Sequence, residues 1–127
     1  LILKDAFLIC ERINKNREEF ESQTQFSSEV EAYVLENFRN PDLNISIASM
    51  HFGKTPAYFS SLYKKETGRS LLDFINITRT NYAYQLLENG MTVAEAGEAS
   101  GFRDSGGFIR IFKKYKGITP GMVSKKS

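Results

Sequence analysis

One stretch of this chain occurs twice, and the repeat constrains the fold more than any other feature of the sequence. The first copy consists of Ile45-Ser46-Ile47-Ala48-Ser49, Gly53, Phe59, Leu62-Tyr63-Lys64-Lys65 and Gly68. The second copy consists of Val93-Ala94-Glu95-Ala96-Gly97, Gly101, Phe108, Ile111-Phe112-Lys113-Lys114 and Gly117. The offset is 48 residues before the turn (45 to 93) and 49 after it (59 to 108). Two copies are too few for a solenoid, so the repeat indicates a duplicated supersecondary unit.

Helix start signals recur along the chain, whereas the alternating β-branched runs that would indicate strands are absent. The cap signals are Ser28 with Glu31, Asn44, Thr55 before Pro56, Ser70 with Asp73, Thr92 with Glu95, and Asp104 or Ser105. Helix ends are predicted at Pro41-Asp42, Gly53, Gly68, Asn89-Gly90, Ser100-Gly101 and Gly117, and Thr119-Pro120 opens a last short turn. The sequence therefore predicts an all-α fold of about seven helices.

Each copy of the repeat predicts a short helix, a tight turn at a glycine, and a longer helix. Small residues stand where the two helices would cross, because a close, steep crossing leaves no room for large side chains. These residues are Ala48 and Ser49 in the first copy and Ala96 and Gly97 in the second. The pattern is typical of a helix-turn-helix unit, so we expect two such units.

The longer helix of each copy combines a buried stripe with an outward face. The predicted stripes are Phe59, Leu62 and Tyr63, and Phe108, Ile111 and Phe112. The predicted outward faces are Ala57, Ser60, Ser61 and Lys64, and Gly106, Ile109, Arg110 and Lys113. A face of small and basic residues can enter the major groove of DNA, which accommodates one α-helix. Two such helices would meet one side of a duplex about 34 Å apart, and a linking helix of about 25 Å with its flanking helices can hold that separation.

Further landmarks lie between residues 30 and 123. In order they are Tyr58-Phe59-Ser60-Ser61-Leu62-Tyr63-Lys64-Lys65, Gly68, Arg79, Ala83, Leu86-Leu87, Gly101-Phe102, Asp104, Phe108, Phe112-Lys113-Lys114, Gly117 and Thr119-Pro120. In this order they resemble the DNA-binding domain of AraC/XylS-type transcription regulators, and the group from Gly101 onward is the most diagnostic. The resemblance implies a seven-helix domain with two helix-turn-helix motifs, which binds DNA and usually activates bacterial transcription.

The chain departs from that family pattern at four places. Ser49 and Gly97 stand where the family usually has alanine. Gly106-Gly107 replaces a polar and an aromatic residue, and Val123-Ser124 replaces Tyr-Arg. Each helical glycine costs about 1 kcal/mol relative to alanine. We therefore expect the start of the second long helix either to fray without DNA or to lie very close to the backbone of a partner.

The helix signals and the resemblance together give a domain organisation. Residues 1–27 are interpreted as a helical extension or a linker from a preceding domain, and residues 28–127 as the AraC-type DNA-binding domain. Within that domain, we expect helix-turn-helix units at about 45–67 and 93–116 and a linking helix at about 71–88.

Candidate DNA-contacting residues lie at the start and on the outward face of each longer helix. They are Pro56, Ala57, Ser60, Ser61, Lys64, Ser105, Gly106, Arg110, Lys113 and Lys114. Arg110 is the strongest candidate for a base contact, because arginine pairs with O6 and N7 of guanine; a phosphate contact is the alternative. The lysines are expected at phosphates, with simple solvation as the alternative. Pro56 and Ala57 offer apolar contact to a thymine methyl, whereas serine discriminates poorly between bases.

The other conspicuous side chains are predicted to be structural. Phe59, Tyr63, Phe102, Phe108 and Phe112 are expected in the core. Tyr58, one step off the buried stripe, is the exception and is placed to reach a phosphate. Arg79 is expected to tie the linking helix to a neighbouring turn, and Asp104 to cap a helix.

Charge is unevenly distributed along the chain. Residues 1–36 carry four basic and eight acidic residues, a net charge of −4. The remaining 13 basic and seven acidic residues give the rest of the chain +6. A positive C-terminal part favours a polyanion partner such as double-stranded promoter DNA, although a solvated lysine-rich tail explains the asymmetry equally well.

Several other function classes find no support in the sequence. No stretch approaches the roughly 18 apolar residues of a membrane span. Cys10 is the only cysteine, which suits a reducing compartment, and a bacterial cytoplasmic location is expected. Cys10 and His51 lie far apart in sequence, and there is no metal-ligand spacing or phosphate-binding loop. No catalytic residue, cofactor or metal, and hence no enzyme activity, is expected.

The start of the chain leaves two interpretations open. Apolar residues recur at steps of four and three, with Asn16 at one of the positions; they are Ile2, Ala6, Ile9, Ile13 and Phe20. This favours a homodimer through residues 1–20, because a polar residue in such a seam can fix the register. A linker helix packed on its own domain explains the pattern equally well. The resemblance implies a preceding sensory or receiver domain and RNA polymerase as a partner.

Two functions follow from these observations. The first is sequence-specific binding of double-stranded DNA through two major-groove helices, regulating and activating bacterial transcription. The alternative is a protein-interaction module that tethers or antagonises a transcription regulator through the acidic N-terminal helix. The weakly polar outward faces keep this alternative open.

Overall fold

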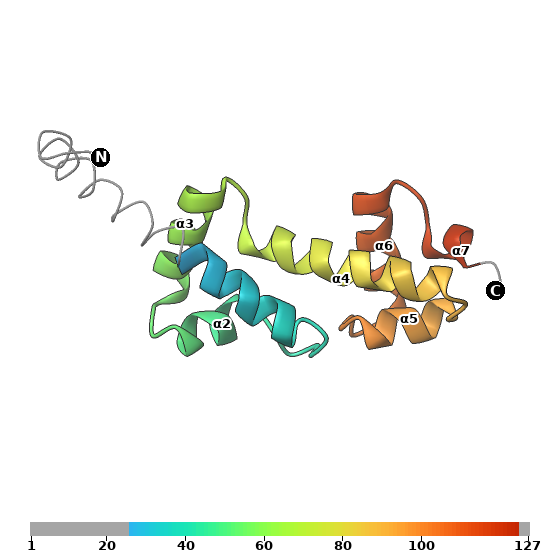
Figure 1. Ribbon diagram of the computed structural model, residues 1–127, viewed down its shortest axis with the longest axis horizontal. Helices are drawn as coiled ribbons and strands as arrows, with labels where there is room; N and C mark the ends of the chain where they lie inside the picture. The colour runs from blue at the N-terminus through green and yellow to red at the C-terminus, as the bar shows by residue number, and fades with distance from the viewer. Residues whose placement is uncertain (1–25, 125–127) are drawn as a thin grey trace, which may run out of the picture.

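The computed structural model describes residues 26–124, and within that span the chain forms seven helices and no strand (Figure 1). They are a leading helix at residues 26–37, α2 (Ile45–His51), α3 (Pro56–Thr67), α4 (Leu71–Glu88), α5 (Val93–Ala99), α6 (Ser105–Lys116) and α7 (Pro120–Val123). This confirms the all-α prediction: α2 and α3 form the first helix-turn-helix unit, α5 and α6 form the second, and α4 links them. None of the described helices is long and apolar enough to cross a membrane. The predicted dimerisation helix at residues 1–20 lies outside the described residues.

Side-chain caps begin five of these helices at the predicted positions. Each capping oxygen accepts a hydrogen bond from the backbone N–H three residues later, at 2.6–3.3 Å. The capping residues are Asn44, Thr55, Ser70, Thr92 and Asp104. These bonds satisfy N–H groups that the first turn of a helix leaves without partners. The local sequence therefore fixes where these helices begin.

The predicted capping box of Ser28 and Glu31 is wrong. Phe26 and Ser27 are already helical, so Ser28 lies inside the leading helix rather than at its start. The Glu31 carboxylate instead accepts a hydrogen bond from the Tyr63 hydroxyl at 2.6 Å. Phe26 makes edge-to-face contacts with aromatic rings of the first unit, and this packing favours helix upstream of Ser28. The predicted boundary between residues 27 and 28 falls inside this helix, and the division into extension and domain stays a prediction.

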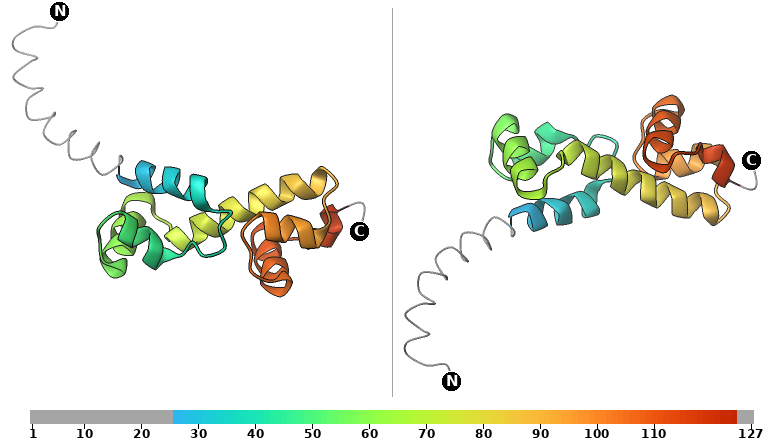
Figure 2. Two further views of the ribbon diagram at one scale, coloured as in Figure 1. Left: turned by 90° about the horizontal axis from the view of Figure 1, so that it is seen from below. Right: turned by 90° about the horizontal axis from the view of Figure 1, so that it is seen from above.

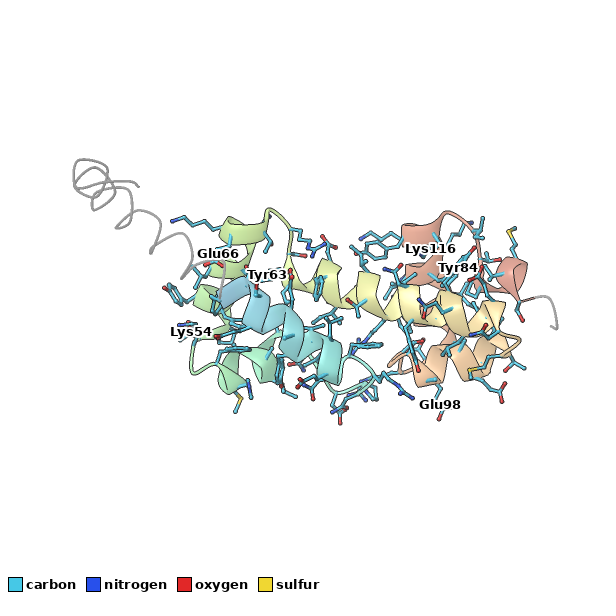
Figure 3. The ribbon with its side chains drawn as sticks, viewed as in Figure 1. Lys54, Tyr63, Glu66, Tyr84, Glu98 and Lys116 are labelled. Carbon is cyan, nitrogen blue, oxygen red and sulfur yellow. The ribbon has the colours of Figure 1, made fainter. Side chains whose placement is uncertain are left out.

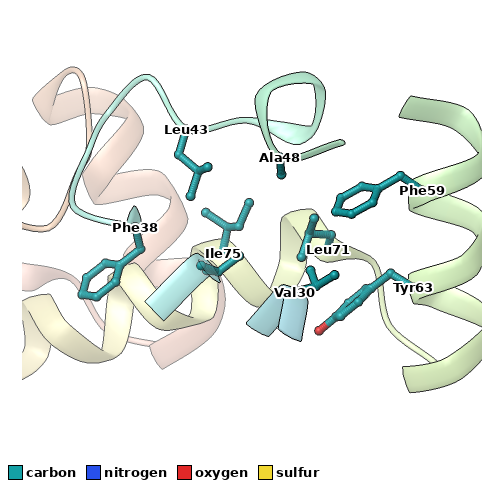
Figure 4. Close-up of a cluster of buried hydrophobic side chains, with 9 residues drawn as sticks. Val30, Phe38, Leu43, Ala48, Phe59, Tyr63, Leu71 and Ile75 are labelled. Carbon is teal, nitrogen blue, oxygen red and sulfur yellow. The ribbon is translucent and has the colours of Figure 1, made fainter. Parts of the chain in front are cut away.

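Two separate hydrophobic clusters stabilise the fold, one at each end of α4. The first cluster consists of Val30, Val34, Phe38, Leu43, Ala48, Phe59, Tyr63, Leu71 and Ile75 (Figure 4). The second consists of Ala83, Leu87, Ala96, Phe102, Phe108, Phe112 and Val123. Because α4 contributes residues to both clusters, it positions one helix-turn-helix unit relative to the other.

A further contact joins α4 to the turn that follows the leading helix, and it is centred on Arg79 of α4. The buried Arg79 guanidinium donates hydrogen bonds to the Phe38 carbonyl at 2.8 Å and to the Asn40 carbonyl at 3.0 Å. These bonds confirm that Arg79 ties the linking helix to a neighbouring turn. Arg39 reaches across to the Ala99 carbonyl at 3.1 Å. The end of the leading helix is thereby joined to both α4 and the end of α5.

Candidate nucleic-acid interface

The two longer helices, α3 and α6, lie at opposite ends of α4 and on the same side of it (Figure 1, Figure 2). The leading helix lies on the other side (Figure 2). This arrangement leaves the outward faces of α3 and α6 clear of the helices that form the rest of the domain.

The face of α3 is small and weakly polar. Ala57, Ser61 and Lys64 are exposed, as is Pro56 at the helix start, whereas Ser60 is only half-exposed. Tyr58 is 57% exposed, and the Lys54 ammonium lies 5.4 Å from the centre of its ring. Tyr58 thus stands outside the core as predicted, beside a positive charge.

The face of α6 is more basic and more apolar. Its exposed residues are Ser105, Gly106, Ile109, Arg110, Lys113 and Lys114. Phe108 and Phe112 are buried on the opposite side, as the predicted stripe requires. The sequence-predicted contact residues of α6 therefore share one face. Ile109, assigned to that face but not to DNA contact, is 39% exposed among them.

The first turn of α6 is helical despite its two glycines. The Asp104 carboxylate accepts a hydrogen bond from the Gly107 N–H at 2.6 Å, which confirms Asp104 as the cap. A Cβ on Gly107 would lie 3.2 Å from that carboxylate oxygen, whereas one on Gly106 would lie 3.6 Å from it, an ordinary contact. The fold therefore does not require glycine at position 106.

The crossing of α5 and α6 explains one of the departures from the family pattern. A Cβ on Gly97 would lie 2.7 Å from Cδ2 of Phe108, closer than packed atoms approach. Glycine at this position lets the Phe108 ring pack directly against the backbone of α5. Ala48, Ser49 and Ala96 are likewise buried, which confirms the prediction of small residues at both helix crossings.

Tyrosine–carboxylate hydrogen bonds hold α3 and α6 against the leading helix and α4, and no local sequence pattern predicts them. The Tyr63 hydroxyl of α3 donates to Glu31 of the leading helix at 2.6 Å, and Tyr63 lies between these helices (Figure 3). The Tyr115 hydroxyl of α6 donates to Asp73 of α4 at 2.6 Å. Burial and the neighbouring carboxylate raise the pKa of each tyrosine to about 12. The bond from Tyr115 also lowers the pKa of Asp73.

The described residues contain no group of three or more His, Cys, Asp and Glu that could hold a metal ion.

Comparison with known proteins places this architecture in a family. A family model described as a helix-turn-helix domain matches residues 49–126. The arabinose operon regulatory protein of Escherichia coli is 29% identical over 89 residues, which are 69% of this chain and 30% of that protein. The chain belongs to the AraC-type helix-turn-helix family. It is a DNA-binding domain of the transcription-regulator type.

Two regulators of Bacillus subtilis show how much of a longer protein such a domain occupies. The uncharacterized regulator YtdP is 32% identical over 90 residues, covering 70% of this chain and 12% of YtdP. The uncharacterized regulatory protein YesN is 30% identical over 98 residues, covering 73% of this chain and 26% of YesN. This AraC-type chain therefore spans only a small part of the length of these relatives.

Solved structures share the fold. The C-terminal domain of the two-component response regulator yesN from Fusobacterium nucleatum is 27% identical, with a TM-score of 0.74 over 77% of this chain and 96% of that chain. The DNA-binding domain of the global transcriptional factor AdpA, solved with a target DNA, is 23% identical. Its TM-score is 0.69 over 76% of this chain and 86% of that chain.

Proposed function

We propose that this AraC-type domain binds double-stranded promoter DNA sequence-specifically, with α3 and α6 as recognition helices in successive major grooves. The observation that carries the proposal is the placement of both helices on one side of α4, each with an exposed face free of acidic side chains. A rigid α4 would hold the two helices at the spacing of neighbouring grooves, about 34 Å along a duplex. The AdpA domain, which shares the fold, was solved with a target DNA.

The contacts divide into base recognition and backbone positioning. Arg110 pairs with a guanine, and Lys64, Lys113 and Lys114 neutralise phosphates. Small residues at the helix starts allow close approach to the groove; they are Pro56, Ala57, Ser60, Ser61, Ser105 and Gly106. Because phosphate contacts release counterions, they make affinity fall steeply with salt, whereas Arg110 sets which sequence is preferred.

We propose that this domain, once bound at a promoter, contacts RNA polymerase and activates transcription in the bacterial cytoplasm. A receiver or sensory domain preceding it would control that activity. The C-terminal domains of two response regulators, AraT of Geobacillus stearothermophilus and yesN of Fusobacterium nucleatum, share its fold. A promoter fused to the selected site should therefore give more transcript when the domain is supplied, and less transcript would contradict activation.

Selection from random duplexes with this 127-residue chain tests DNA binding directly. We expect one enriched sequence with two half-sites about one helical turn apart. Affinity for that duplex should exceed affinity for a scrambled one at least about a thousandfold and fall as salt rises. Removing a phosphate-contacting lysine, as in Lys113→Gln, should reduce the slope of log affinity against log salt by about 1 on both duplexes. Enrichment of no sequence, with equal binding to both duplexes, would reject the proposal.

A further inference from the structure

Ile109 is the one exposed large hydrophobic side chain of α6. It is a branched aliphatic side chain, 39% exposed, on a face otherwise made of small, polar and basic residues. Ile111, two positions later, is partly buried and packs against the second cluster, whereas Ile109 is among the exposed large hydrophobic residues. A β-branched residue also lowers helix propensity slightly. Ile109 therefore exposes more of its side chain than Ile111 does, and that exposed part belongs to the outward face of α6.

The surroundings of Ile109 leave its side chain prominent. Residues three and four positions apart are neighbours on a helix, so Ile109 lies between the buried Phe112 on one flank and three exposed residues, Ser105, Gly106 and Lys113. A helical side chain leans toward the N-terminus and covers the preceding turn, which here carries Gly106. Since a Cβ on Gly106 would meet only the Asp104 carboxylate at 3.6 Å, the fold does not impose this glycine. Its effect is to leave the space beside Ile109 open.

We infer that Ile109 recognises the 5-methyl group of a thymine in the major groove, next to the base that Arg110 contacts. This inference rests on the proposed function. The thymine methyl is the one apolar group that base edges present in the major groove, where the other groups are hydrogen-bond donors and acceptors. Burial of an exposed branched alkyl group against this methyl group lowers the free energy of binding, whereas contact with a charged phosphate gives an alkyl group no such hydrophobic stabilisation.

The first unit provides an internal contrast. The residue 49 positions before Ile109 is Ser60, which is polar and half-buried on α3. Ala57 and Pro56 are the apolar groups of that face, and both are shorter than isoleucine. A strong methyl contact should therefore be confined to the half-site bound by α6.

Deoxyuridine substitution tests the inference because it removes the methyl group and leaves all hydrogen-bonding groups in place. In the selected duplex, each thymine is replaced in turn by deoxyuridine, and affinity is measured for three chains: unchanged, Ile109→Ala and Ile118→Ala. Ile118 is a matched control, since it is also an isoleucine, 37% exposed, but lies between α6 and α7. Circular dichroism checks that each variant is folded.

We expect the unchanged chain to lose about four- to tenfold in affinity at one thymine, the value of one buried methyl group. Ile109→Ala should bind the thymine duplex more weakly and show no further loss with deoxyuridine there. Ile118→Ala should keep the full loss. Equal losses with and without Ile109 at every thymine, or a selected site without a thymine in either half, would overturn the inference while leaving DNA binding intact. Absence of any specific binding would instead reject the proposed function.

Discussion

The two helix-turn-helix units share one packing scheme but expose different chemistry. Their buried stripes are aromatic at equivalent positions, with Phe59 matching Phe108. Their outward faces differ: Ser61 of α3 corresponds to Arg110 of α6, 49 positions later. The duplicated fold thus kept its core while its surface diverged. We therefore expect α6 to supply most of the direct base recognition and α3 to position the domain.

Substitutions in the turns of the two units are expected to give the largest difference in the free energy of unfolding. Gly53 and Gly101 are equivalent, with φ of +68° and +98°. A Cβ on Gly101 would collide with the Phe38 carbonyl oxygen, whereas one on Gly53 would meet nothing within 4 Å. Gly101→Ala should therefore lower the free energy of unfolding by about 2–5 kcal/mol, and Gly53→Ala by about 1–2 kcal/mol for its left-handed φ alone. Urea unfolding followed by circular dichroism measures both, and equal losses would show that the second turn is no more tightly packed than the first.

The Arg79 contact tests whether the two units behave as one body. Arg79→Met removes both hydrogen bonds from α4 to the turn after the leading helix, where Gly101 of the second unit also approaches the Phe38 carbonyl, and leaves that buried carbonyl without this donor. We expect a loss of about 2–3 kcal/mol in the free energy of unfolding. Asp42→Asn is the control, because it removes only the exposed ion pair with Arg103 and should cost about 0.5 kcal/mol or less. Two separate transitions in the unchanged chain would contradict a single cooperative body.

Substitutions at equivalent exposed positions of α6 and α3 test whether the two helices contribute differently to base recognition. Arg110→Ala should weaken binding to the selected duplex by about 10- to 100-fold, because a bidentate contact to guanine is lost. Ser61→Ala, at the equivalent position of α3, should change affinity less than about threefold. Fluorescence anisotropy with the selected and the scrambled duplex gives both values. An equal loss on the two duplexes would assign Arg110 to a phosphate rather than a base.

The parts of the fold that the sequence predicts are those governed by neighbours along the chain. Asn44, Thr55 and Thr92 cap helices because each oxygen meets an N–H three residues later. Ser28 and Glu31 have the same spacing but form no cap, because Ser28 lies inside a helix that already includes Phe26, and the Glu31 carboxylate instead binds Tyr63, 32 residues away. Such a partner is brought in by tertiary packing and leaves no local signal.

The candidate site also has features that neighbours along the chain predict and features that depend on tertiary packing. Helical periodicity predicts that Arg110 and Lys113 share an exposed face, because side chains three apart lie together on a helix. The placement of α3 and α6 on one side of α4 depends on how helices pack, as does the tight contact of Gly97 with Phe108. Small residues at the crossings signal a close approach but not its direction.

The tyrosine hydrogen bonds have the smallest expected effect on the free energy of unfolding. They test whether α3 and α6 are anchored in the same way although their outward faces differ. Burial and a carboxylate partner raise the pKa of Tyr63 and of Tyr115 to about 12, from an ordinary 10.0. A raised pKa means that the folded state binds the tyrosine proton more tightly than the unfolded state does. The resulting stabilisation is therefore complete below pH 10 and is lost as the pH rises toward 12.

Tyr63→Phe and Tyr115→Phe should each cost about 1 kcal/mol at pH 7 for the lost hydrogen bond. Each should also make the loss of stability between pH 10 and 12 shallower than in the unchanged chain, since phenylalanine does not titrate. Urea unfolding at a series of pH values measures both effects. Similar behaviour of the two variants would show that the units are anchored in the same way, so that their difference lies in the outward faces. If only Tyr63→Phe altered the alkaline profile, α6 would be held mainly by its aromatic stripe, and the scaffolds as well as the surfaces would have diverged.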